Sequence, residues 1–328
     1  MKSISSIKNK NKLFNNLYKK MLKIRMVEES IAHYYHEQEM RCPVHLSIGQ
    51  EAVAAGVCEN LNITDKIIST HRSHAHYLAK GGNLKKMLAE LYGKNTGCVK
   101  GLGGSMHLQD YPKGIISSVP IVGSTIPIGV GVSLATNLKK RINKNITVIF
   151  FGEGATEEGV FHESINFAGI HDLPILFICE NNLYSVYTSM QPRQSKKRDI
   201  VKIAESNGIK SEYGDGNNVL EVYSLVKKNI EYIKKYSKPV LLEFSTYRWL
   251  EHCGPNWDDD LGYRKKNELK KWIKKCPIKH FEKNYYKENK NKTKINNLIQ
   301  KEIIQAYRFA KKSKFPNSNI IDKYIYSK

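Results

Sequence analysis

Two short, continuous apolar runs stand out in the middle of the chain. They are NITVIFF at residues 145–151 and PILFICE at residues 174–180. Continuous runs of this length are typical of strands that are buried on both faces of a parallel sheet. Between them, residues 156–170 place apolar side chains at helical spacing and acidic residues in the first turn, which predicts a crossover helix. A strand, a helix and a second strand form a right-handed parallel unit, so the pattern predicts an α/β fold.

The same patterning extends the expected fold in both directions. An apolar run at 239–244 follows a predicted helix at 218–236, and it adds a strand to a mostly parallel sheet flanked by helices. Residues 11–37 carry apolar positions at helical spacing and predict an N-terminal helix, and beyond Leu261 the chain is Lys-rich and helical in pattern. We therefore expect three regions: a helical N-terminal arm at 1–42, an α/β domain at 43–265 and a Lys-rich helical region at 266–328.

The charge of the chain is unevenly distributed. It has 53 Lys and Arg against 31 Asp and Glu, a formal net charge of +22, which suggests binding to nucleic acid or to a membrane surface. However, only nine of these residues are Arg, and residues 101–190 carry five basic and seven acidic side chains. The surplus therefore belongs to the two ends of the chain. We expect no specific nucleic-acid partner, and a basic nucleic-acid-binding protein is the alternative from another functional class.

The cysteines and the hydropathy of the chain indicate the cellular compartment in which the protein is expected. The six cysteines contain no CxxC pair, which argues against a zinc site and against a disulfide framework. The first two dozen residues are basic but lack the apolar run of a signal peptide, and nowhere do 18 apolar residues follow one another. These features predict a protein of the cytoplasm with reduced thiols and no membrane partner.

Two polar turns follow the two central strands directly. The first is Gly152-Glu153-Gly154-Ala155, and the second contains Asn182 and Tyr184. Ligands of parallel sheets bind outside the carboxyl ends of the strands, where such turns gather. Glycines let the backbone approach a bulky anion, and a carboxylate, an amide oxygen and a backbone carbonyl form an all-oxygen ligand set. The pattern favours Mg²⁺ bound with a diphosphate over two ordinary turns, because both turns stand at predicted strand ends.

At these residues the sequence resembles the thiamine-diphosphate enzymes, whose fingerprint is GDG, a spacer in the twenties, and NN. Its other motifs narrow the resemblance to the alpha subunit of the dehydrogenase component of 2-oxo-acid dehydrogenase complexes, of the pyruvate and acetoin types. The resembling segments, in order, are SIGQEAVAAGV at 47–57, HRSHAHYLAKGG at 71–82, GLGGSMH at 101–107, IVGSTIPIGVG at 121–131, GEGATEEGVFHESINFA at 152–168, ENNLYSVYT at 180–188 and YRWLEHCGPNWDDDLGYR at 247–264.

The resemblance implies a role for each matching residue. Glu153, Asn182 and the carbonyl of Tyr184 are expected to hold Mg²⁺. The remaining implied residues are Arg72, Arg248 and the amides of Gly154 and Ala155 for the diphosphate, His71 and Gly152 beside the cofactor, Val122 for the aminopyrimidine, and His107 and His252 as active-site histidines.

The chain departs from the family pattern at three places. Glu153 stands where relatives have Asp, which moves the carboxylate about 1.3 Å further from the backbone. His71 stands where many relatives have Tyr, and this places one diphosphate hydrogen bond in question. The Leu250-Glu251 segment differs from the pyruvate type, so the identity of the 2-oxo acid does not carry over.

The resemblance also implies partners. The motifs account for the half of the site that binds diphosphate and metal, and little chain is left for a second α/β domain. We therefore expect a beta subunit that supplies the pyrimidine-binding half, in an α2β2 assembly. The acyl group taken from a small 2-oxo acid is expected to pass to a lipoyl-bearing acyltransferase. The alternatives are a non-oxidative decarboxylase or carboligase subunit without a lipoyl partner, and a scaffold subunit.

Overall fold

The computed structural model describes residues 10–138, 145–286, 291–320 and 324. The beginning of the expected N-terminal arm, residues 1–9, and part of the expected C-terminal region lie outside these residues. Within them, six strands form one sheet in the order β2-β1-β3-β4-β8-β7, and every neighbouring pair in it is parallel. The strands are β1 Lys66–Ser69, β2 Ile115–Ser118, β3 Thr147–Gly152, β4 Ile175–Asn181, β7 Lys210–Asp215 and β8 Val240–Ser245. The predicted α/β fold with a parallel sheet is confirmed.

The two apolar runs form the central strands β3 and β4 for the expected reason. Along β3, Val148 and Phe150 enter one hydrophobic core, whereas Ile149 and Phe151 enter a second core on the other face of the sheet. Successive side chains of a strand point to opposite faces, so a strand that is buried on both faces must be apolar throughout. The continuous runs in the sequence therefore mark the middle of the sheet.

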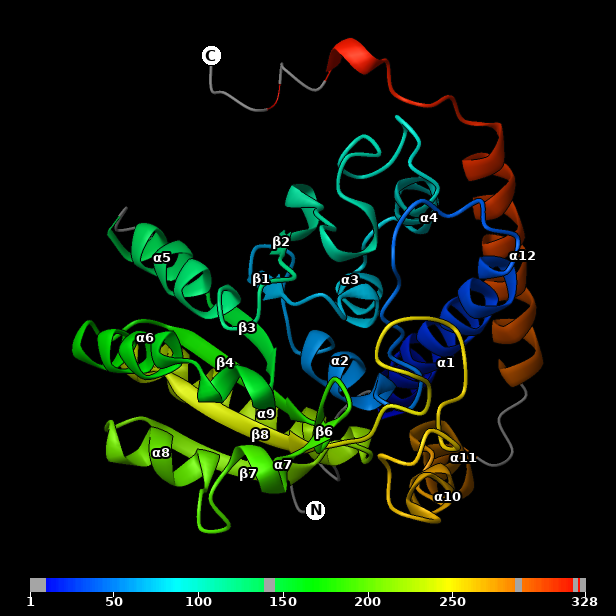
Figure 1. The fold of residues 1–328 in the computed structure, drawn as a ribbon. Helices are drawn as coiled ribbons and strands as arrows, with labels where there is room; N and C mark the ends of the chain where they lie inside the picture. The colour runs from blue at the N-terminus through cyan, green and yellow to red at the C-terminus, as the bar shows by residue number, and fades with distance from the viewer. Residues whose placement is uncertain (1–9, 139–144, 287–290, 321–323, 325–328) are drawn as a thin grey trace.

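Helices cover both faces. Figure 1 shows α5 (Thr125–Leu138), α6 (Gly159–Ile170) and α8 (Ile200–Ser206) together on one side of the sheet, away from α1 (Lys10–Tyr35). The larger core on the other face gathers side chains of α1, α2 (Glu51–Cys58) and α9 (Val219–Tyr236). The remaining helices are α3 His74–Ala79, α4 Leu84–Leu91, α7 Met190–Arg193, α10 Glu268–Lys274, α11 Pro277–Tyr285 and α12 Asn291–Lys312.

The Lys-rich end of the chain is a packed helix. Helix α12 contacts α4 and α1, so segments from both ends of the sequence lie side by side (Figure 1). Its inner face carries Ile295, Ile299 and Ile303, spaced four residues apart. The lysine surplus of this region is thus accompanied by a regular apolar face. Helices α1 and α12 both pack against helices of the α/β region. The division of the chain into three regions stays a prediction.

The crossover helix begins later than the sequence predicts. Residues Glu153–Glu157 form a 3-10 turn, Glu158 is extended with a ψ of 138°, and helix α6 starts only at Gly159. The hydroxyl of Thr156 donates to the carbonyl of Glu153 and closes the turn. The expected helical first turn at residue 156 is therefore wrong, and the amides of residues 154 and 155 belong to the 3-10 turn.

A buried carboxylate holds the glycine-rich loop that follows α4. Glu90 accepts four backbone N–H bonds, from Val99 and Gly101 at 2.9 Å, Gly103 at 2.8 Å and Gly104 at 3.1 Å. Gly101 has a φ of +79°, and a Cβ there would lie 2.6 Å from the backbone of Gly93. A single side chain thus fixes the course of the loop that ends near the pocket described below.

In the part of the chain that the structure describes, no helix combines the length and the apolar character needed to cross a membrane. All six cysteines are free thiols, as the sequence predicts.

Candidate functional site

A pocket with a cavity volume of about 180 Å³ opens at the carboxyl ends of the central strands. The segments that follow β1, β2, β3 and β4 all contribute to its lining, from Thr70, Val119, Gly152 and Glu180 onward. The chain runs from β1 outward to β2 and then returns to β3 on the other side of β1, so the strand order reverses between β1 and β3. This is the position at which open α/β sheets bind ligands.

The structure brings most of the predicted site residues into this pocket. The lining includes His71, Arg72, Val122, Gly152, Glu153, Gly154, Ala155, Asn182, Tyr184 and His252. It also includes residues that the sequence did not single out, namely His45, Gln50, Thr70, Met106, Glu180, Ser185 and Val186. Two predicted residues, Arg248 and His107, are not part of the lining.

Arg248 is buried beside the pocket and is occupied by protein partners. Its guanidinium donates to the carbonyls of Leu250 and Val186, each at 2.6 Å, to Asp258 at 3.2 Å and to Tyr263 at 3.0 Å. Val186 lines the pocket, so Arg248 fixes one edge of it. The expected direct contact of Arg248 with a diphosphate stays a prediction, and in this structure carbonyl and carboxylate oxygens surround the guanidinium.

His107 follows the glycine-rich loop and is exposed. Its Nδ1 lies 2.7 Å from the carbonyl of Gly103, which turns the ring back onto its own loop. Its neighbour Met106 lines the pocket instead. The catalytic role that the resemblance implies for His107 stays a prediction.

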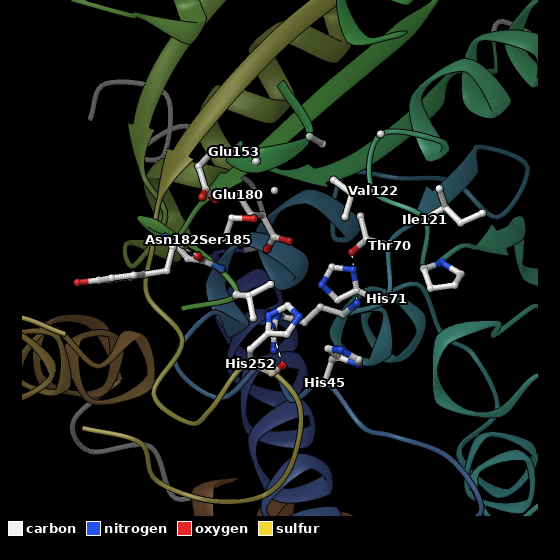
Figure 2. A pocket seen from close by; sticks show the side chains of 18 of the residues that line it. His45, Thr70, His71, Ile121, Val122, Glu153, Glu180, Asn182, Ser185 and His252 are labelled. Carbon is white, nitrogen blue, oxygen red and sulfur yellow. Dashed lines mark hydrogen bonds between the residues drawn. The ribbon is translucent and has the colours of Figure 1, made fainter. Parts of the chain in front are cut away.

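One wall of the pocket is acidic, and we call Glu153, Glu180 and Asn182 the acidic wall (Figure 2). The side chain of Glu153 is 2% exposed, and its Oε1 lies 2.8 Å from Nη2 of Arg193. Burial raises the pKa of Glu153, and Arg193 opposes this rise. Glu180 lies 3.1 Å from Nε2 of His76. Both carboxylates of the wall therefore have a nitrogen partner outside the pocket lining.

Asn182 is held in place on both sides of its amide. Its Oδ1 accepts from the amide of Tyr184 at 3.2 Å, and its Nδ2 donates to Gln50 at 3.4 Å. An amide oxygen has two acceptor positions, so Oδ1 keeps one for a ligand. With the carboxylate of Glu153 it forms an oxygen donor pair in one pocket, which suits a hard cation such as Mg²⁺.

The opposite wall consists of three imidazoles, and we call His45, His71 and His252 the imidazole wall (Figure 2). Their ring centroids are separated by 4.7, 5.0 and 5.3 Å. Burial, reinforced by the charge of Arg72, lowers the pKa of His45 to about 2 and the pKa values of His71 and His252 to about 3. All three rings are therefore neutral near pH 7.

Arg72 supports the imidazole wall from behind. It donates from Nη1 to the carbonyl of Leu46 at 2.7 Å and from Nη2 to the carbonyl of His252 at 3.2 Å. Burial and the charge of Arg248 lower the pKa of Arg72 to about 10, so it is still cationic near pH 7. A buried guanidinium in a pocket is an anion-binding group.

The turn between the walls is shaped for a close backbone approach. A Cβ at Gly154 would lie 3.0 Å from Oγ of Ser185, which is tighter than ordinary contact. On the rim, Ile121 is 69% exposed and Val122 is 49% exposed. The pocket therefore has polar walls, a glycine turn between them and an apolar rim that faces outward.

The residues that sequence reasoning missed differ in how visible they were. Glu180 ends the PILFICE run, and its place at the carboxyl end of a strand could have marked it. His45 lies in an irregular segment and Arg193 ends the short helix α7, and neither position carries a spacing signal.

Comparison with known proteins places the whole chain. The family described as "Dehydrogenase E1 component" matches residues 18–319. The subunit alpha of the pyruvate dehydrogenase E1 component of Rickettsia bellii is 36% identical over 313 residues, which cover 94% of each chain. The subunit alpha of acetoin:2,6-dichlorophenolindophenol oxidoreductase of Bacillus subtilis is 36% identical over 315 residues, or 94% of this chain and 92% of that protein. A pyruvate dehydrogenase E1 component subunit alpha from Porphyra purpurea is 32% identical over 320 residues, or 95% and 92%.

Proposed function

Because the chain belongs to the dehydrogenase E1 component family, we propose that it is the alpha subunit of a thiamine-diphosphate-dependent 2-oxo-acid dehydrogenase. Together with a beta subunit it decarboxylates a small 2-oxo acid and transfers the acyl group to a lipoyl acceptor. One observation carries this proposal: the turns after β3 and β4 meet in a single pocket, opposite a buried arginine and three neutral histidines.

The acidic wall holds the metal ion. Glu153, Asn182 and the carbonyl of Tyr184 are the ligands of Mg²⁺, and the free acceptor position of Asn182 supports this assignment. The ion compensates the charge of a diphosphate, which would otherwise face Glu153 and Glu180. The oxygen donor set fits the ion, although Glu153 is also paired with Arg193.

The 3-10 turn at Glu153–Glu157 would hold the diphosphate. The amides of Gly154 and Ala155 are at the beginning of this turn, where backbone N–H groups have no partner within it. Arg72 contributes the positive charge, and Arg248 acts indirectly by fixing Val186. Val122, on the apolar rim, contacts the aminopyrimidine ring. When bound, thiamine diphosphate supplies a nucleophilic carbon and an electron sink for decarboxylation.

The imidazole wall receives the 2-oxo acid. Arg72 points toward Nδ1 of His252 at 3.4 Å, which favours the tautomer that carries its proton on Nε2. Nε2 of His252 is therefore the atom that donates a hydrogen bond to the substrate. His71 and His45 are neutral as well, so they bind the carboxylate as hydrogen-bond donors and add no fixed charge.

The partner of this chain is a beta subunit that completes the cofactor site, in an α2β2 assembly. The exposed Ile121 and Val122 on the pocket rim support an interface at this position, because exposed apolar side chains beside a ligand pocket favour contact with another protein. The lipoyl-bearing acyltransferase is the further partner that the oxidative reaction requires.

The test is reconstitution. The chain is co-expressed with its beta subunit, and thiamine diphosphate binding is measured by calorimetry with and without Mg²⁺. Decarboxylation is then followed over a series of 2-oxo acids with an artificial electron acceptor. We expect binding that requires both subunits and Mg²⁺, and the absence of any cofactor binding by the pair would end the proposal.

The acceptor is tested separately. Turnover with a free lipoyl domain is compared with turnover with an aldehyde in place of an oxidant. Reductive acylation of the lipoyl domain supports the oxidative reaction. Product formation with the aldehyde alone would replace it by carboligation.

A further inference from the structure

Arg193 lies beside the pocket, in contact with Glu153, and the proposed function assigns it no role. It ends helix α7, which follows the small hairpin of β5 (Tyr184–Ser185) and β6 (Thr188–Ser189). Its Nη2 lies 2.8 Å from Oε1 of Glu153, and its Nη1 pairs with Glu157. Its Nε lies 3.2 Å from the carbonyls of residues 188 and 189. The guanidinium is therefore fixed in orientation and aimed at the carboxylate of the acidic wall.

The contact between Arg193 and Glu153 is partly buried, and Glu153 itself is fully buried. The two side chains are 13% and 2% exposed. A carboxylate that is removed from water requires a counter-ion, and removal of one partner from such a pair leaves an uncompensated buried charge. Arg193 supplies the counter-ion here. Arg193 contacts Oε1 of Glu153, and the proposed function assigns the same carboxylate to Mg²⁺. The guanidinium of Arg193 and the Mg²⁺ ion therefore bind the same group.

Arg193 has a second carboxylate to which it can turn. Glu157 is 26% exposed and also accepts from Nε2 of Gln194 at 2.6 Å. If Arg193 loses Glu153, it keeps Glu157 and its two carbonyl partners. The exchange therefore leaves no unpaired arginine behind, and the protein cost of releasing Glu153 is small.

We propose that Arg193 competes with the divalent cation for Glu153 and thereby sets the cation affinity of the site. This inference rests on the proposed function. It also gives a reason for glutamate at residue 153: the extra methylene carries the carboxylate about 1.3 Å further from the backbone, which brings it within reach of Arg193. The apparent affinity for Mg²⁺ then falls as the fraction of molecules in which Arg193 holds Glu153 increases.

The first experiment measures cation affinity directly. Calorimetry on the assembled alpha and beta subunits, at a fixed thiamine diphosphate concentration, gives the Mg²⁺ affinity of the wild type and three variants. We expect Arg193→Ala to bind Mg²⁺ about threefold to tenfold more tightly than wild type. Arg193→Lys keeps a competing charge and stays closer to wild type, and Arg308→Ala, at an exposed position of α12, is the unchanged control.

A gain in affinity on losing an arginine separates competition from a structural role. Disruption of the pocket would weaken Mg²⁺ binding, and so would loss of a direct contact between Arg193 and the diphosphate. Affinity for Mg²⁺ that is equal to or weaker than that of wild type in Arg193→Ala overturns the proposal.

The second experiment tests the match between the two side chains. With Glu153→Asp, the carboxylate is too short to be shared, so adding Arg193→Ala to this variant should leave the Mg²⁺ affinity unchanged. A double-mutant cycle should therefore give a non-zero coupling free energy between positions 153 and 193 for Mg²⁺ binding. Additive effects of the two substitutions would contradict the proposal.

The third experiment removes the cofactor from the question. In EDTA, Arg193→Ala should lower the Tm relative to wild type and Arg308→Ala, because Glu153 is left buried without a counter-ion. If the wild-type pair binds no thiamine diphosphate, the proposed function fails, and the competition is then measured with Mn²⁺ alone. The same order of affinities is required there, and an unchanged Tm together with unchanged Mn²⁺ binding rejects the inference by itself.

Discussion

The acidic wall and the imidazole wall of the pocket solve the same electrostatic problem in different ways. In the acidic wall, each carboxylate has a nitrogen partner behind it: Arg193 for Glu153 and His76 for Glu180. The imidazole wall keeps charge off its rings, because burial and Arg72 hold all three in the neutral form. Among the described residues, the histidines that pair with carboxylates are His74 and His76, which lie outside this wall.

The difference teaches how one pocket can bind an anion and also orient a substrate. A wall of carboxylate and amide oxygens is suited to hold a cation and, through it, a diphosphate. A wall of neutral rings beside one fixed cation is suited to donate hydrogen bonds to a substrate without adding charge. Each of the following variants tests whether binding and chemistry are divided between the walls in this way.

The largest effect is expected from His252→Ala. We expect turnover to fall by about 100-fold to 1,000-fold, because a positioned hydrogen-bond donor is lost, while thiamine diphosphate affinity stays within a few-fold. Steady-state kinetics and calorimetry on the reconstituted enzyme measure the two quantities. An equal loss of cofactor affinity would break the division between the walls. An equally large loss of turnover in His107→Ala would show that His107 enters the site in the assembled enzyme.

Glu153→Gln tests the acidic wall at almost constant shape. Removing the negative charge takes away the anionic ligand of the cation and leaves Glu157 as the charged partner of Arg193. We expect Mg²⁺-dependent binding of thiamine diphosphate to weaken by about 100-fold. Glu163→Gln, at an exposed position of α6, is the matched control. Binding within threefold of wild type would show that the cation is held elsewhere.

Arg72→Lys measures how much the fork geometry of the guanidinium contributes. A lysine keeps the charge, but it is a point charge that cannot hold the carbonyls of Leu46 and His252 together while facing an anion. We expect cofactor affinity to fall by about tenfold, as measured by calorimetry. If the KM for the 2-oxo acid rises about tenfold and cofactor affinity is unchanged, Arg72 binds the substrate rather than the cofactor.

The smallest effect concerns acid stability. His71 has a folded-state pKa of about 3, below its ordinary value of 6.5, so between these values the unfolded chain binds more protons than the folded chain. Stability therefore rises with pH across this window and is lost as the pH falls. His71→Tyr should reduce the drop in Tm between pH 7 and pH 5 by about 2 °C. The exposed His36 offers the control His36→Gln, and an unchanged drop in His71→Tyr would show that His71 is not held neutral.

The sequence predicted the parts of this molecule in which one pattern has one structural outcome. The apolar runs of β3 and β4 end in polar turns, and parallel strands bring their carboxyl ends together, so Glu153 and Asn182 had to meet. The meeting of Glu153 and Asn182 in the acidic wall was predictable for that reason, whereas Glu180 was not singled out. The start of α6 was not, because Thr156 closes a 3-10 turn on Glu153 and delays the helix.

The imidazole wall was only partly predictable. His71 and His252 follow the ends of β1 and β8, whereas His45 reaches them from an irregular segment before α2. The partners of Arg248 were not predictable either: its motif indicates a phosphate, and the structure adds Asp258 and two carbonyls around its guanidinium. Partners that come from distant loops leave no periodic trace in the sequence.

The carboxylate of Glu90 has a consequence for how this chain can evolve. It recognises backbone N–H groups of the loop at residues 99–104 and none of its side chains. The non-glycine residues of that loop can therefore change without losing the anchor, whereas Gly101 and Gly104 have a positive φ and a Cβ at Gly103 would lie 2.6 Å from Val99. Met106, which follows the loop, lines the pocket. Selection for new substrates can therefore change the non-glycine side chains of the loop while Glu90 of α4 keeps its backbone in place.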